Sequence, residues 1–133
     1  MNDIAHLKYL RMALVLVGII FIFGIYLLMI VWPAGWTWHT GHSDYPLMIV
    51  GIYAMLGVFL LWAARNPFEH LSLIWFTVWS SVVHGGIMLL QSFGMPENHG
   101  HLIGDVPPLF IVAALLGFLT PRRGALSPRG ATA

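Results

Sequence analysis

Cysteine is absent from this chain, and charged residues are scarce. With Cys 0 among 133 residues, disulfides, thiolate metal sites, iron–sulfur clusters and cysteine nucleophiles are excluded. Charged residues make up 8% of the chain, against about 25% in soluble domains. The formal net charge of +1 is too small to indicate a nucleic-acid partner. The scarcity of charged residues therefore indicates a protein that lies in a lipid bilayer.

Apolar residues dominate instead, at 59% of the sequence against roughly 45–50% in soluble proteins. The length predicts a single transmembrane domain, residues 1–133. A membrane crossing takes about 20 consecutive apolar residues in a helix. The predicted spans are residues 12–31, 47–64, 71–93 and 102–119, followed by a predicted disordered tail, 121–133. The predicted fold class is an all-α integral membrane protein, an antiparallel four-helix transmembrane bundle.

The basic residues indicate how this bundle is oriented. All 6 Lys and Arg fall on one side of the four-span arrangement, and the other two loops contain none. Basic residues collect on the cytoplasmic side of membrane proteins. We therefore predict an inner-membrane protein with both termini in the cytoplasm. The basic residues are Lys8, Arg11, Arg65, Arg122, Arg123 and Arg129.

Two ionisable residues lie deep within the predicted spans, where such groups are costly and commonly functional. His84 and Asp105 are each about 20 Å from the inner end of their helices at a rise of 1.5 Å per residue. The sequence therefore predicts that they hydrogen-bond directly or through one water. Gln91 and Met88 share a helical face with His84, and Ser81 precedes it by about one turn. These five residues form the predicted ligand-binding set.

Asp105 also has a structural interpretation. It precedes Val106-Pro107-Pro108, and an Asp before Pro in a first turn is typical of a helix N-cap. A helix starting there would be too short to cross a bilayer, so the residues before Asp105 would enter the membrane without helical structure. Three interpretations of His84 and Asp105 stay open: a functional pocket, a structural hydrogen-bond latch between helices, or no contact between the two residues.

The outward loops carry a second candidate site. His39 and His42 lie in one loop, and His99 and His101 lie in the other. Imidazoles without thiolates suit zinc or copper(II), although the spacing lacks the regularity of known metal motifs. Haem is less favoured, because His84 is the only deep histidine and a second axial ligand would have to come from another subunit.

The chain resembles an uncharacterised bacterial family of short four-span membrane proteins, distantly similar to the DoxX-like group. The resemblance covers residues 45–122 and rests on the run RNPFEHLSLIWFTVWSSVVHGGIMLLQS followed by HGHLIGDVPPLF. It implies a four-helix membrane bundle and brings no activity. Its distinctive points are Arg65-Asn66-Pro67, His70, Ser81, His84-Gly85, Gln91, His101 and Gly104-Asp105.

The leading functional prediction is a non-catalytic accessory subunit or a bundle that binds a small molecule or lipid at a buried His–Asp site. Homo-oligomers or a larger membrane complex are the predicted assemblies. One alternative is a membrane enzyme that performs acid–base chemistry on a lipid-like substrate, with His84 transferring the proton and Asp105 orienting it. Another alternative is a metal- or haem-binding electron-transfer subunit.

Overall fold

The structure, a computed structural model, describes residues 3–38, 41 and 43–121, and within them it is built from helices without strands. Four stretches are long and apolar enough to cross a membrane: Ile4–Val31, Tyr45–Ala63, Pro67–Gly94 and Pro96–Leu119. This confirms an all-helical protein and indicates a membrane protein. Residues 122–133 of the predicted tail lie outside the described part. The helices are α1 (Asp3–Ile19), the π-helix η1 (Ile20–Gly24), α2 (Ile25–Val31), α3 (Pro33–Trp36), α4 (Tyr45–Ala63), the 3-10 helix η2 (Pro67–His70), α5 (Leu71–Gly94), the 3-10 helix η3 (Pro96–Leu102) and α6 (Val106–Leu119).

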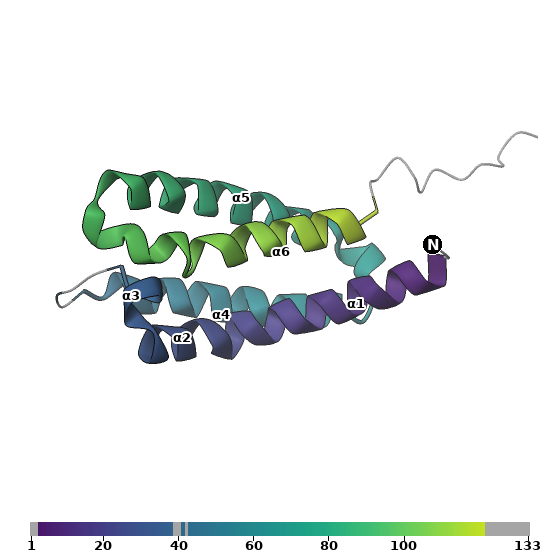
Figure 1. Cartoon of the computed structure of the whole chain (residues 1–133). Coiled ribbons are helices and arrows are strands. Elements are labelled where there is room, and N and C mark those ends of the chain that lie inside the picture. Colours follow the sequence, from purple (N-terminus) through teal and green to yellow (C-terminus); the bar gives the residue numbers. More distant parts are fainter. Residues whose placement is uncertain (1–2, 39–40, 42, 122–133) are drawn as a thin grey trace, which may run out of the picture.

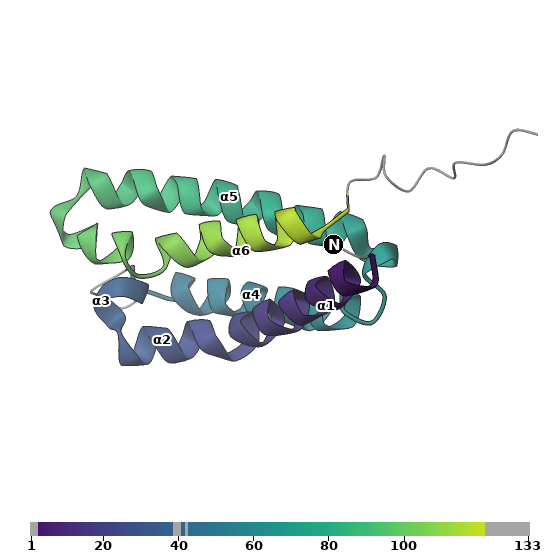
Figure 2. The same cartoon turned by 45° about the vertical axis from the view of Figure 1, so that its right-hand side comes forward.

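The helices form two layers. In both views α5 lies beside α6, and the continuous run of α1, η1 and α2 lies beside α4 (Figures 1 and 2). α1 also packs against α6 and so joins the layers. The short helix α3 packs against η3 at the end of the bundle away from the N-terminus. We call this the α3–η3 end.

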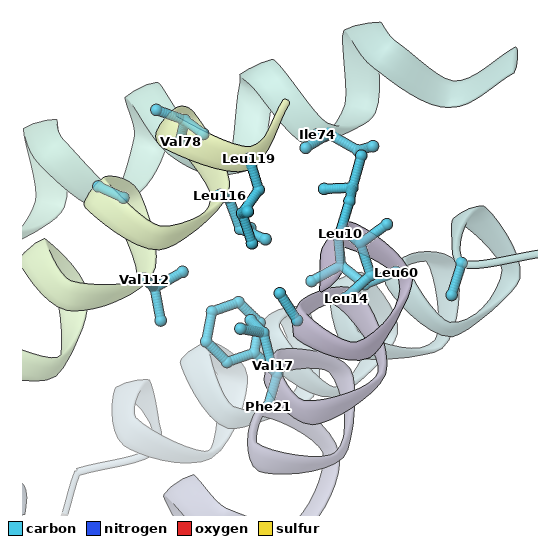
Figure 3. Close-up of a cluster of buried hydrophobic side chains, with 13 residues drawn as sticks. Leu10, Leu14, Val17, Phe21, Leu60, Ile74, Val78, Val112, Leu116 and Leu119 are labelled. Carbon is cyan, nitrogen blue, oxygen red and sulfur yellow. The ribbon is translucent and has the colours of Figure 1, made fainter. Parts of the chain in front are cut away.

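A cluster of apolar side chains fills the space between the layers, toward the end of the bundle where α1 begins and α6 ends. Figure 3 shows side chains from α1, α4, α5 and α6 converging there. Leu14, Leu60, Ile74 and Leu116 are completely buried. Outside the bundle, by contrast, large apolar side chains such as Leu90 and Phe118 are 75% and 77% exposed. An apolar exterior of this extent suits contact with lipid tails rather than water.

Two glycines let α1 and α4 approach closely. A Cβ placed on Gly57 would lie 2.6 Å from the carbonyl oxygen of Gly18, and one placed on Gly18 would lie 2.9 Å from the carbonyl oxygen of Gly57. Small residues serve this purpose in membrane bundles, where helix association depends on close van der Waals packing.

Two helix boundaries differ from the predicted spans by more than two residues. The first helix begins at Asp3, nine positions before predicted span 12–31, so its first turns contain the charged residues of the N-terminal segment. Predicted span 102–119 is not one helix, because the chain passes through η3 and a turn before α6 begins at Val106. The consecutive Pro107 and Pro108 lack N–H groups and are tolerated only in the first turn, which places the helix start just ahead of them.

Candidate functional site

Glycines bring the backbones of α3 and the η3–α6 turn into contact. A Cβ on Gly104 would lie 2.1 Å from the carbonyl oxygen of Gly35, and one on Gly100 would lie 2.3 Å from the carbonyl oxygen of Ala34. The backbone N–H of Asp105 donates to the same Gly35 oxygen at 3.1 Å. This contact holds Asp105 next to α3 and to the residues that follow α3 in the sequence.

The carboxylate of Asp105 accepts hydrogen bonds from two side chains. Nδ1 of His101 donates to Oδ1 at 2.9 Å, and Nε1 of Trp38 donates to Oδ2 at 2.7 Å. The rings of Trp38 and His101 also stack, with centroids 3.9 Å apart and planes inclined by 25°. His101 is only 2% exposed, so its N–H depends on this carboxylate. The expected N-cap role of Asp105 is not taken by its side chain, which makes no capping hydrogen bond to α6.

A second polar pair joins the two layers. The hydroxyl oxygen of Tyr53 in α4 lies 2.5 Å from Nδ1 of His84 in α5. The ring of Phe21 packs edge-on against Tyr53, with centroids 4.9 Å apart and planes at 89°. Phe21 lies in η1, and π-helical turns inside longer helices often occur at functional sites.

Trp38 and Asp105 from the first hydrogen-bonded group, and Tyr53 and His84 from the second, line one cavity of about 530 Å³ between the two layers. Most of its lining is apolar and comes from η1, α2, α4, α5 and α6. The polar side chains of the lining include Tyr53, His84, Gln91 and Asp105. An apolar cavity with a few convergent polar groups is the usual form of a small-molecule site.

The cavity unites most of the predicted ligand-binding set. His84, Met88, Gln91 and Asp105 line it, whereas Ser81 is buried in α5 outside the lining. His84 and Asp105 make no direct hydrogen bond, so that form of the prediction is wrong, whereas a bond through one water stays a prediction. Within the described residues, the ring of His84 bonds to Tyr53, and the carboxylate of Asp105 bonds to His101 and Trp38. The two residues are neighbours across a cavity rather than partners.

The predicted outer metal site receives no support from the described residues. His39 and His42 lie outside them, His99 is exposed, and His101 is turned into the bundle toward Asp105. In residues 3–38, 41 and 43–121, no three His, Asp or Glu side chains are grouped closely enough to hold a metal ion.

Sequence reasoning missed three members of the site. His101 and Asp105 are four residues apart, a spacing that brings side chains together in helical backbone and could have indicated their pairing. Tyr53 carries a hydroxyl in an otherwise apolar helix, which was a usable signal. Nothing in the sequence position of Trp38 indicates its hydrogen bond to Asp105, which depends on the contact of α3 with η3.

Comparison with known proteins gives a family and no activity. The chain belongs to DUF6632, a family of unknown function, which it matches over residues 4–133. No curated protein matches the chain, and no solved structure matches it. The expectation of an uncharacterised family is therefore confirmed, while the distant DoxX-like similarity and the bacterial origin stay predictions.

Proposed function

We propose that this protein binds a small amphipathic molecule from the surrounding bilayer. The observation that supports this is the cavity at the α3–η3 end. Its volume of about 530 Å³ lies within the roughly 300–1,000 Å³ typical of ligand sites. Its apolar walls suit a hydrocarbon body, and the side chains of Tyr53, His84, Gln91 and Asp105 offer hydrogen bonds to a polar group.

The cavity walls reach the outer surface of the bundle. Ile20 and Ile111 both line the cavity, and they are 39% and 63% exposed. In a membrane, side chains on that surface face lipid. A ligand with an apolar chain can therefore pass between η1 and α6 without leaving hydrocarbon, while its polar group stays near the deeper hydrogen-bonding residues.

The same proposal fixes an orientation in the membrane. We place the bundle antiparallel in the inner membrane, with both termini cytoplasmic and the α3–η3 end outward, because the basic residues gather at the other side. The role remains a non-catalytic one, performed alone, as a homo-oligomer or as an accessory subunit of a larger membrane complex.

A second candidate is acid–base catalysis on a lipid-like substrate. It is favoured by the Tyr53–His84 hydrogen bond at the cavity wall, since an imidazole held by a phenol is a proton-transfer pair. His84 would exchange the proton and Tyr53 would orient the ring. If this candidate holds, His84→Gln should abolish a lipid conversion while the protein still binds the substrate.

Native mass spectrometry of the protein purified from membranes tests the binding proposal. We expect a 1:1 small-molecule adduct on the wild type. Val50→Trp places a large side chain in the cavity lining and should remove the adduct. Val58→Trp makes the same change on the same helix at an exposed position outside that lining and should retain it. Equal adducts on all three proteins would place the bound molecule elsewhere.

A further inference from the structure

The cavity lining contains a carboxylate and none of the described Lys or Arg side chains. Asp105 is the acidic residue of the lining, and the described Lys8, Arg11 and Arg65 do not take part in it. Arg11 instead donates to the carbonyl oxygen of Arg65 at 3.2 Å, next to Ala64 at the far end of α4. Asp105 is paired with His101 but has no Lys or Arg partner among the described residues, and in a medium of low dielectric constant such a carboxylate attracts a positively charged group at contact distance.

Aromatic rings accompany this carboxylate. Trp36, Trp38, Tyr45 and Tyr53 all line the cavity, and two of them contact its polar groups: Trp38 bonds to Asp105 and Tyr53 to His84. A cation placed over the face of Trp or Tyr is attracted by the ring quadrupole, and aromatic cages with a nearby carboxylate suit substituted ammonium groups in particular. Phe21 adds a fifth ring at the apolar side.

Asp105 retains the capacity to bind such a group. An ionised carboxylate has about four lone-pair sites, and His101 and Trp38 occupy one on each oxygen. These two donors hold the carboxylate in position. The Trp38 and His101 rings also stack on each other, which limits the movement of both donors. A substituted ammonium needs proximity to the charge more than a directed hydrogen bond, so the existing bonds can persist when it binds.

From this arrangement we infer that the ligand is a cationic amphiphile, an apolar chain that carries an ammonium group held between Asp105 and the aromatic side chains. This inference rests on the proposed function and names the chemical class that the same cavity selects. The chain occupies the apolar region between η1 and α6, and the ammonium group lies toward α3.

Three probes with one chain length test this inference. Protein in the uncharged detergent dodecyl maltoside is titrated with radiolabelled dodecyltrimethylammonium, dodecanol and dodecyl sulfate, and binding is read by scintillation proximity. We expect the cation to bind at least about tenfold more tightly than the other two probes, given the strength of cation–π and charge contacts. Tetramethylammonium, which has the same headgroup and no chain, should not displace it.

Two variants locate the preference. Asp105→Asn should reduce cation affinity to the level of dodecanol, whereas Glu97→Gln, which removes an exposed carboxylate from η3 outside the lining, should change nothing. Should Asp105→Asn fold poorly, Tyr45→Leu serves instead, since Tyr45 is exposed and its ring is expected to contribute about threefold to cation binding and little to dodecanol binding.

The outcomes separate the inference from the function on which it rests. Equal binding of the three probes would overturn the inference and leave the binding function intact. Binding of tetramethylammonium as tight as that of the long-chain cation would also overturn it, because the chain would then play no part. Failure of all three probes to bind would contradict the proposed function itself.

Discussion

Trp38 and His101 share one acceptor, the carboxylate of Asp105. Among the described residues, neither Nε1 of Trp38 nor Nδ1 of His101 has another partner. A buried donor that loses its acceptor costs about 1–3 kcal/mol. The α3–η3 end is therefore most sensitive to the substitution of a single residue, because the Asp105 side chain accepts hydrogen bonds from two different segments.

Asp105→Ala should destabilise the protein by about 2–4 kcal/mol, since it leaves two N–H groups without an acceptor. Asp105→Asn keeps one oxygen that can accept and should cost about half as much. Thermal unfolding in detergent measures both changes. A loss of less than about 0.5 kcal/mol for Asp105→Ala would show that the hydrogen bonds of Trp38 and His101 contribute little.

A double-mutant cycle distinguishes the pairing found in the structure from the one predicted. Tyr53→Phe and His84→Leu should show a coupling energy of about 0.5–3 kcal/mol, as residues in contact do. The cycle of His84→Leu with Asp105→Ala should give a smaller value, because these two side chains make no hydrogen bond to each other. The reverse order of the two coupling energies would contradict the assignment of partners.

Residue chemistry could be predicted further than residue pairing. Depth in an apolar segment predicted that His84 and Asp105 lie at a similar level, because helical rise converts sequence position into depth, and both residues line the cavity. Their partners could not be predicted in the same way. Trp38 reaches Asp105 only because glycines let α3 contact the η3–α6 turn, and that contact joins segments far apart in the sequence.

At the scale of the elements, glycine positions decide which helices touch. Gly57 meets the backbone of Gly18 across the α1–α4 contact, whereas Gly51 on the same helix has open space around its Cα. A backbone atom cannot rotate away from an added methyl group as a side chain can. The same substitution at Gly57 and at Gly51, both on α4, should therefore have opposite effects on stability.

Gly57→Ala should destabilise the bundle by about 1–3 kcal/mol, because the added Cβ would overlap the backbone of α1. Gly51→Ala is the matched control and should be neutral or stabilising by up to about 1 kcal/mol, the difference in helix propensity. Unfolding in a denaturing detergent measures both variants. Equal effects of the two would show that the α1–α4 contact is not as close as described.

Gly104→Ala should act on the site rather than on the core. Its Cβ would collide with the carbonyl oxygen of Gly35, so α3 must move away from the η3–α6 turn and carry Trp38 away from Asp105. Ligand affinity should fall about tenfold or more. Gly86→Ala, on α5 with nothing near the added atom, should bind like the wild type; equal loss in both variants would argue against this coupling.

Helix existence was predictable and helix boundaries were less so. Apolar runs long enough to cross a membrane predicted four candidate spans, and the described part of the chain contains four. The break before α6 depended on whether Pro107 and Pro108 lie inside a helix or in its first turn, and the sequence admitted both interpretations. The π-helical turn at η1 has no sequence signal that we recognise, although it supplies Ile20 and Phe21 to the cavity.

At the scale of the whole molecule, topology carries the next prediction. A reporter fused after Thr132 should be cytoplasmic, and reporters inserted at Gly41 or Asn98 should be external, because the Lys and Arg residues collect on the other side. Alkaline phosphatase and green fluorescent protein fusions distinguish the two sides. A cytoplasmic signal at Gly41 would overturn the proposed orientation.

The cavity between the layers is the central claim, and photo-crosslinking tests it most directly. Membranes containing the protein are treated with a diazirine-bearing alkylamine, and the labelled residues are mapped by mass spectrometry. We predict that adducts concentrate on cavity residues of α4 and α5 such as Tyr53 and Met88, well above those on Leu90, which lies on α5 facing outward. Labelling that is heaviest on Leu90 and other outward residues would show that the amphiphile only coats the bundle.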